Sequence, residues 1–428
     1  MTTTSPDRLA LEYQAARPRG AALHREASRY FAARGATHFA RAAVPFRPYI
    51  THASGSRKWD ADGHEYIDYV MGHGALMLGH NHPAVVAAVQ QQLTRGVHFG
   101  DNHELEVEWA RLIQTLMPSA ERIEFFACGQ EANLLGIRLA RIHTARRRVL
   151  RLRFNYHGWA DELAGPQAAG TVADEVTLIE PNDLVLLERE LLTRKYAVLL
   201  IEGGGAYLAG RVPIAVEYYQ ALPELTRRSG TVLLLDEVVT GFREGPGGWQ
   251  AVVGIRPDLT SVGKAVSGGL PAGGLLGRAE LFQPLDPGSR PERLVVHGGT
   301  WNALPLTAAA GIAACRLYQD GEPQRLARRR ADSFSHAGNA VLGRLGVRGR
   351  LQGRTAVHLI LGDSEGGPGS HTQANRRLDL HLLQRGISTL LGDAFIFSSA
   401  HTQDDVEQTV DALAQSLQAM LEEGTLPS

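Results

Sequence analysis

The sequence predicts an α/β protein built on a mostly parallel sheet. From about residue 105 onward, short aliphatic runs alternate with longer segments of helical periodicity. Several runs lack the polar and apolar alternation of a half-exposed strand, which indicates strands buried on both faces. Helices at 130–143, 183–193 and 215–229 supply the crossovers that parallel strands require. The predicted strands are 122–127, 149–154, 176–179, 198–202, 232–236 and 275–276.

A second, smaller domain is expected beside this sheet. Residues 7–34 are rich in Ala, Arg and Leu and predict one or two surface helices. Residues 59–69 alternate around an Asp-Gly pair, which predicts a hairpin. The C-terminal part predicts a helical stretch at 306–345, strands near 355–361 and 394–398, and a helix at 403–422. We therefore expect an N-terminal segment 1–60 that joins the small domain, a large domain 61–305 and a small domain 306–428.

Composition and charge exclude several classes of function. Lys and Arg number 44 against 45 Asp and Glu, so the net charge of -1 gives no reason to expect nucleic acid or an anionic membrane as a partner. The two cysteines, Cys128 and Cys315, make neither a disulfide framework nor a metal motif. The N-terminal residues do not resemble a signal peptide, and no apolar run approaches the roughly 20 residues that span a bilayer. We expect a cytoplasmic protein.

An acid at the end of a predicted strand is the first candidate for chemistry. The apolar run at 231–235 ends in two adjacent carboxylates, Asp236 and Glu237. Ligands of open parallel sheets bind beyond the carboxyl ends of the strands. A carboxylate buried there needs a cationic partner, so Asp236 is placed to bind a positively charged ligand group. The alternative is an ordinary acid that caps the next helix.

A lysine in a glycine-rich segment is the second candidate. Lys264 lies between apolar residues and a run of glycines, in a part of the chain where lysine is rare. Partial burial of such an amine lowers its pKa and makes it a nucleophile for Schiff-base formation. The alternative is a surface lysine in a flexible turn.

Two further segments follow predicted strands directly. At Cys128-Gly129-Gln130 a strand turns into a helix, whose free N–H groups form a ready anion site. Tyr156 and His157 offer flat side chains that could stack on a planar cofactor. Plain turns and packing residues are the alternatives. These segments together supply the four parts of a pyridoxal phosphate site: an anion site, an aromatic side chain that can stack on a ring, an acid and an amine.

The motifs also match a known family. Residues 236–243, Asp-Glu-Val-Val-Thr-Gly-Phe-Arg, and residues 257–264, Pro-Asp-Leu-Thr-Ser-Val-Gly-Lys, are specific in combination. From about residue 35 to 420 the sequence resembles the class III aminotransferases, most closely the glutamate-1-semialdehyde 2,1-aminomutase branch. The resemblance implies a fold-type I transferase dependent on pyridoxal 5'-phosphate, with a mostly parallel seven-stranded sheet in a large domain and a smaller α+β domain.

The resemblance also implies roles for individual residues. Lys264 would form the Schiff base and later move the proton, and Asp236 would pair with the ring nitrogen. Val238 would lie against one face of the ring and Tyr156 against the other. His157, the next residue, is also expected to bind the cofactor. Glu202 would lie near the ring hydroxyl. The phosphate would be bound by Cys128, Gly129 and Gln130, and by Thr300 from the neighbouring subunit of a homodimer.

The residues expected around the substrate depart from the family pattern. Arg41 would bind a substrate carboxylate. His73 stands where the aminomutases have Trp, and Tyr207 where the family has Asn. Asp393 aligns with a Glu characteristic of the aminomutases.

The sequence therefore predicts an aminotransferase that moves an amino group between an amino acid and a keto acid. A β-amino acid or a specialised-metabolism amine is a candidate substrate. The alternatives are a pyridoxal phosphate aminomutase, such as a glutamate-1-semialdehyde enzyme, and an amino-acid racemase or epimerase. A non-catalytic binding scaffold would be favoured by loss of Lys264 or Asp236, and both are present. A nucleotide enzyme would need a glycine-rich phosphate loop of known spacing, and we find none that convinces.

Overall fold

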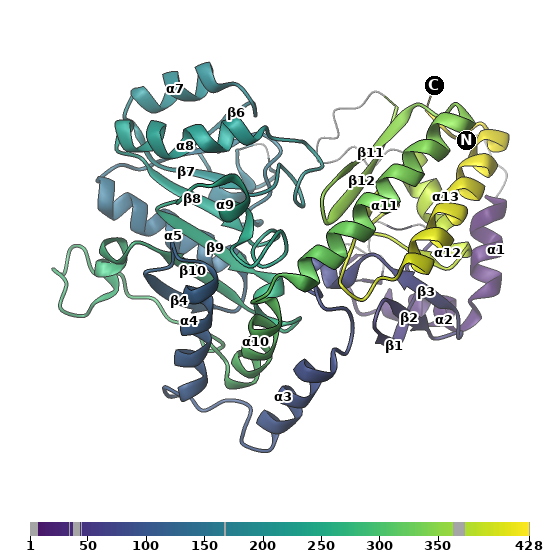
Figure 1. Cartoon of the computed structure of the whole chain (residues 1–428), viewed down its shortest axis with the longest axis horizontal. Helices are drawn as coiled ribbons and strands as arrows, with labels where there is room; N and C mark the ends of the chain where they lie inside the picture. The colour runs from purple at the N-terminus through teal and green to yellow at the C-terminus, as the bar shows by residue number, and fades with distance from the viewer. Residues whose placement is uncertain are drawn as a thin grey trace. The chain divides into compact units, whose positions relative to one another are not determined.

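A computed structural model describes residues 7–33, 35–36, 43, 45–166, 168–362 and 373–427. The described residues pack into two compact units. One unit draws on Met1–His73, Leu78–His82 and Ala327–Ser428, and the other on Gly74–Met77 and Pro83–Leu326. The larger of the two contains the predicted sheet, whose strands run in Figure 1 from dark blue at β4 through teal to green at β10.

The sheet has seven strands in the order β4-β10-β9-β8-β7-β5-β6. The registered pairs between β5, β6, β7, β8 and β9 are parallel, and β10 is antiparallel to both of its neighbours. The predicted α/β fold with a mostly parallel seven-stranded sheet is thus confirmed. The strands are β4 (Arg122–Phe126), β5 (Arg148–Leu152), β6 (Val176–Ile179), β7 (Tyr196–Glu202), β8 (Val232–Glu237), β9 (Leu259–Gly263) and β10 (Gly273–Gly277).

Burial on both faces explains the unbroken aliphatic runs. In β7, Val198 and Leu200 join one core cluster with residues of α5 (Gly129–Thr144). The alternate residues Leu199 and Ile201 join a second cluster with residues of α7 (Leu184–Leu192) and α8 (Val216–Ser229). Because successive side chains of a strand point to opposite faces, both parities must be apolar when helices cover both faces.

The sequence analysis did not predict β9. Its residues, Leu-Thr-Ser-Val-Gly, include two hydroxyl residues and run into the glycine-rich segment, so they resemble a loop. In the structure all five are buried between β8 and β10, because the central position in the sheet outweighs local preference. The omission matters, since Lys264 directly follows this strand.

The helical stretch predicted at 306–345 is two helices. α10 (Pro305–Tyr318) packs against α3 (Pro83–Leu93) and α4 (Glu104–Leu116), and α11 (Glu322–Leu345) begins four residues after α10 ends. Gly321 has φ +73° between them, a backbone conformation that interrupts a right-handed helix. Of the helices described, none is long and apolar enough to cross a membrane.

The smaller unit joins N-terminal and C-terminal segments. The predicted hairpin is β2 (Arg57–Asp60) and β3 (Glu65–Asp68), which pair antiparallel. β13 (Ile387–Ser388) adds to β3 in parallel. The predicted domain boundaries, at residues 60 and 305, stay predictions. The unit also contains β1 (Ile50–Ser54), β11 (Gly349–Gly353), β12 (Ala356–Leu361), β14 (Ala394–Ile396), α1 (Arg8–Ala16), α2 (Pro18–Ala27), α12 (Gln373–Gln384) and α13 (Gln403–Glu423).

Candidate active site

Three adjacent strands end in polar residues at one edge of the sheet. Glu202 and Asp236 are register partners at the ends of β7 and β8, and Lys264 follows β9. This is the carboxyl edge, where open α/β sheets bind ligands. The fold therefore brings the predicted acid and amine to neighbouring positions.

Asp236 is buried and held by three donors. Its Oδ2 accepts hydrogen bonds from His157 Nδ1 at 2.7 Å and Asn133 Nδ2 at 2.8 Å, and its Oδ1 accepts one from Val238 N at 2.9 Å. Burial alone would raise the pKa of Asp236, but the hydrogen bonds from His157, Val238 and Asn133 leave this pKa below its ordinary value. Asp236 is thus a buried, ionised carboxylate.

His157 is buried, and its side chain contacts Asp236. It is only 3% exposed, and burial lowers its pKa to about 4, against the opposing effect of its bond to Asp236. A neutral imidazole bonded to a carboxylate through Nδ1 carries its proton there. His157 is therefore not free to stack on a cofactor, whereas the neighbouring Tyr156 is 48% exposed, and its stacking role stays a prediction.

The buried His157 predicts a loss of stability in acid. Between pH of about 6.5 and about 4 the unfolded chain binds a proton at this residue that the folded chain does not. The free energy of unfolding therefore falls as the pH falls through this window, by about 2 kcal/mol at pH 5 for this residue. Urea unfolding of the apoprotein at pH 7.5 and pH 5 measures it. His157→Gln should reduce the pH dependence by that amount, and an unchanged dependence would contradict a buried neutral imidazole.

Glu202 has the opposite electrostatic character. Burial and then the charge of Asp236 raise the pKa of Glu202 to about 8. Its Oε2 accepts hydrogen bonds from Asn155 Nδ2 at 3.2 Å, Tyr156 N at 2.8 Å and Tyr207 N at 2.7 Å. The two neighbouring carboxyls thus differ in protonation, a separation typical of sites that carry out acid and base chemistry.

Lys264 differs from the other two lysines of the chain. Lys58 forms an ion pair with Asp68 at 2.6 Å, and Lys195 one with Glu190 at 2.9 Å. Within the described residues, the Lys264 amine has no ion-pair partner. Burial lowers its pKa against the opposing charge of Asp236. A lowered pKa and an uncommitted amine are what a lysine nucleophile requires.

The adjacent Glu237 faces away from this cluster. Its carboxylate accepts hydrogen bonds from the backbone N–H groups of Trp249 and Gln250 and from the Thr240 hydroxyl. These contacts hold the start of α9 (Gly248–Val253). Of the two carboxylates at the strand end, only Asp236 belongs to the site, and Glu237 has the helix-capping role that was the alternative for Asp236.

The start of α5 is open to an anion. Cys128 is the N-cap residue, and its side chain makes no capping hydrogen bond, which leaves the first N–H groups of the helix unused by the cap. A Cβ on Gly129 would lie 2.2 Å from Val238 Cγ2, so only glycine fits there. Gln130 Oε1 accepts a hydrogen bond from Trp159 N at 2.7 Å, which leaves its amide NH₂ as a donor. These features fit a bound phosphate.

The expected substrate residues are only partly placed. Tyr207 joins the cluster through its backbone N–H to Glu202 and has φ +61°. His73 and Asp393 belong to the other compact unit, and their substrate-binding roles stay predictions. Arg41 lies outside the described residues. Thr300 is exposed, and its carbonyl accepts a hydrogen bond from His98.

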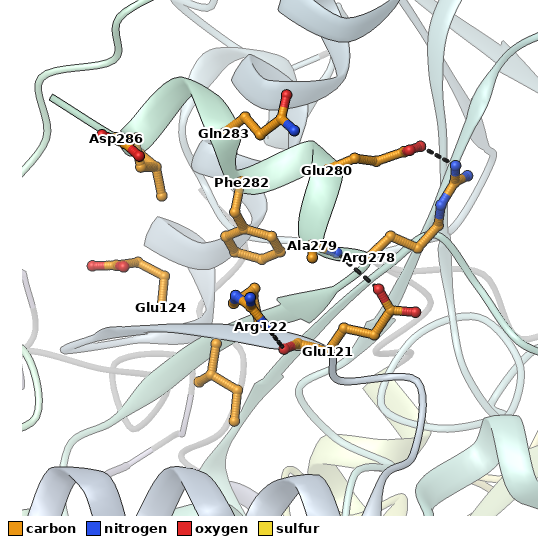
Figure 2. Close-up of a pocket in the computed structure, with 11 residues that line it drawn as sticks. Glu121, Arg122, Glu124, Arg278, Ala279, Glu280, Phe282, Gln283 and Asp286 are labelled. Carbon is orange, nitrogen blue, oxygen red and sulfur yellow. Dashed lines mark hydrogen bonds and ion pairs between the residues drawn. The ribbon is translucent and has the colours of Figure 1, made fainter. Parts of the chain in front are cut away.

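A separate cavity of about 770 Å³ lies beside the amino end of β4 (Figure 2). Figure 2 shows Arg278 paired with Glu280 at its rim. Glu124, which also lines the cavity, pairs with His297. Its charged groups are largely neutralised by such pairs, and no predicted site residue lines it. We assign it no catalytic role.

Comparisons with known proteins identify the family of this chain. The model of the family "Aminotransferase class-III" matches residues 38–166 and 185–344. The glutamate-1-semialdehyde 2,1-aminomutase of Ignicoccus hospitalis is 36% identical over 412 residues, covering 89% of this chain and 94% of that protein.

Solved structures share the fold over nearly the whole chain. A β-phenylalanine aminotransferase from Variovorax paradoxus has a TM-score of 0.88 at 27% identity, covering 98% of this chain and 97% of its own. A transaminase with PLP bound has a TM-score of 0.85 at 26% identity, covering 95% and 99%. The predicted cofactor, pyridoxal 5'-phosphate, is confirmed at the level of the family. The chain belongs to the class III aminotransferase family.

Proposed function

We propose that this chain is a pyridoxal phosphate-dependent aminotransferase that uses Lys264 as its cofactor-binding lysine. One observation carries the proposal: the lysine without an ion-pair partner in the described structure follows β9, beside the buried, ionised Asp236 at the end of β8. When bound, pyridoxal phosphate supplies an electron sink for a carbanion at the substrate carbon.

The residues present fit this cofactor. Lys264 Nζ would hold it covalently, and Asp236 would bind its ring nitrogen. The start of α5 at Gly129, with Cys128 and Gln130, would hold the phosphate. Tyr156 and Val238 would pack on the ring, and Glu202 would bind on the side of the ring hydroxyl.

Each residue then has a chemical task. Asp236 keeps a proton on the ring nitrogen, because its own pKa lies low and its carboxylate accepts that proton's hydrogen bond. Lys264 Nζ would take the proton from the substrate carbon and return it, a task suited to an amine of lowered pKa. Residues Arg41, His73, Tyr207 and Asp393 are our candidates for substrate contacts, with Arg41 binding a carboxylate.

Transamination and aminomutase chemistry differ in the fate of the nitrogen. The departures at His73 and Tyr207 favour an aminotransferase, and likeness to a β-phenylalanine aminotransferase makes a β-amino acid a candidate donor. The alternative, an aminomutase, rests on the 36% identity to a protein of that name. A racemase or epimerase would keep the nitrogen in place.

A panel of ¹⁵N-labelled α- and β-amino acids, each with pyruvate or 2-oxoglutarate, separates these outcomes. We expect ¹⁵N to appear in the product amino acid made from the added keto acid. If the label instead moves to another carbon of the same molecule, the chain is an aminomutase. If the label stays on its carbon and the configuration inverts, the chain is a racemase or epimerase. A cofactor bound to Lys264 as a Schiff base should give the purified protein a visible absorption band that borohydride abolishes. Absence of such a band would contradict the proposed linkage.

We further propose a homodimer in which Thr300 reaches the partner's phosphate site. Large apolar side chains around Thr300 are exposed: Val296 at 81%, Trp301 at 59% and Phe99 at 45%. The Trp301 ring also meets His98, which donates to the Thr300 carbonyl. An apolar surface of this kind marks an interaction site.

Trp301→Glu is expected to dissociate the dimer, because the carboxylate would be buried without a partner at the interface. Sedimentation at micromolar concentration should show a monomer with weakened cofactor retention. Val185→Glu, at an apolar residue on α7 that is 80% exposed, is the control and should stay dimeric. A wild-type chain that sediments as a monomer would contradict the proposal.

A further inference from the structure

Asn133 connects two parts of the candidate site. It lies on α5, and its side chain is completely buried. Its Nδ2 donates to Asp236 Oδ2 at 2.8 Å and to the carbonyl oxygen of His157 at 3.1 Å. One amide group thus ties the end of β8 to the loop that follows β5.

The same helix carries the anion site. Gly129 and Asn133 are four residues apart, so they lie on one face of α5, about 6 Å apart along its axis. The helix therefore sets the distance between its open N-terminus and the carboxylate of Asp236.

The acceptor positions of Asp236 are nearly filled. A carboxylate has about four acceptor positions, two on each oxygen. His157 and Asn133 occupy both positions of Oδ2, and Val238 N occupies one position of Oδ1. Among the described residues no Lys or Arg pairs with Asp236, so one position on Oδ1 remains.

The amide of Asn133 also carries a cost that packing alone would not justify. Its Oδ1 is buried without a hydrogen-bond partner in the described structure. Turning the amide over would place Oδ1 against the Asp236 carboxylate, so the donor assignment stands. A leucine, which has the same branching but no polar atoms, would avoid the unsatisfied oxygen, and the two donated bonds of Asn133 outweigh that cost.

We propose that Asn133 is a positioning residue that, with His157, fills Oδ2 of Asp236 and so directs the remaining acceptor position of Oδ1 to the ring nitrogen of the cofactor. The inference rests on the proposed function, because it requires pyridoxal phosphate at this site. Asn133 itself touches neither the cofactor nor the substrate in this account; it acts through Asp236.

The test compares two ligands that differ only at the ring nitrogen. Pyridoxal phosphate and its 1-deaza analogue, which has carbon in that position, are titrated into the apoenzyme and their Kd values measured. Asn133→Leu should weaken pyridoxal phosphate about tenfold and leave the analogue unchanged, since it removes one hydrogen bond to a charged group. Asn133→Asp, which keeps the size of the side chain, should weaken it more, because two carboxylates in contact cannot both ionise.

Gln250→Leu is the matched control. Gln250 is also a buried amide that donates to a strand-end carboxylate, but that carboxylate is Glu237. This variant should lower stability without changing the ratio of the two Kd values.

The outcomes separate the inference from the proposed function. Equal weakening of both ligands by the Asn133 variants would show a merely structural role and overturn the inference, as would unchanged Kd values in Asn133→Asp if Asn133→Leu fails to fold. In both cases the wild-type chain still binds pyridoxal phosphate and the proposed function stands. A wild-type chain that binds neither ligand would overturn both.

Discussion

Lys264→Ala is expected to lower the rate of amino transfer by about 10⁴-fold or more, because one amine provides both the cofactor linkage and the proton transfer. Lys264 is the lysine without an ion-pair partner in the described structure, so no other lysine lies ready to replace it. Single-turnover formation of the aminated cofactor measures the rate. Borohydride reduction followed by peptide mass analysis should find the cofactor on residue 264 in the wild-type chain and on no residue in the variant.

Lys195→Ala is the control for this change. Lys195 is partly exposed, and its pairing with Glu190 is a surface contact worth at most about 1 kcal/mol. The variant should therefore keep both the rate and the mass label. Labelling of Lys58 or Lys195 in the wild-type chain, or retained turnover in Lys264→Ala, would contradict the assignment.

Those parts of the fold that depend on burial were predictable from sequence. The aliphatic runs of β7 and β8 are continuous because both faces of these strands are covered, and the same logic located the strand-end acids. Asp236 and Lys264 were recognisable because their residue types combine with apolar strands and glycines in a pattern specific to one family.

Other features depend on three-dimensional neighbours and left little trace in the sequence. β9 contains hydroxyl residues that its central place in the sheet tolerates. The partnership of His157 with Asp236 joins residues 79 positions apart, so no local pattern shows it. The only sequence signal for Asn133 was its place in the first turn of the helix predicted at 130–143, and that place does not reveal the carboxylate that Asn133 meets.

Asp236→Asn should lower the single-turnover rate by about 10³-fold while the chain still folds and binds the cofactor. The substituted amide must turn its oxygen toward the His157 and Asn133 donors, since its NH₂ group would repel them. That orientation places the NH₂ group where Oδ1 now lies, so a donor replaces the acceptor that faces the ring nitrogen. A ring nitrogen without its proton stabilises the carbanion poorly. The rate measured with the 1-deaza analogue should therefore be equally low in the variant and in the wild-type chain.

Glu237→Gln provides the matched control for charge and position. The two carboxylates are adjacent, but Glu237 accepts hydrogen bonds from the start of α9, whereas Asp236 faces Lys264 and Glu202. Loss of the Glu237 charge should lower Tm through weakened buried hydrogen bonds and change the single-turnover rate of the folded enzyme by less than about threefold. If Glu237→Gln slowed the reaction as much as Asp236→Asn, the rate would depend only on the total negative charge at the end of β8. The role proposed for Asp236 requires that its carboxylate, and not that of Glu237, contacts the ring nitrogen. It therefore predicts a much larger rate loss in Asp236→Asn than in Glu237→Gln.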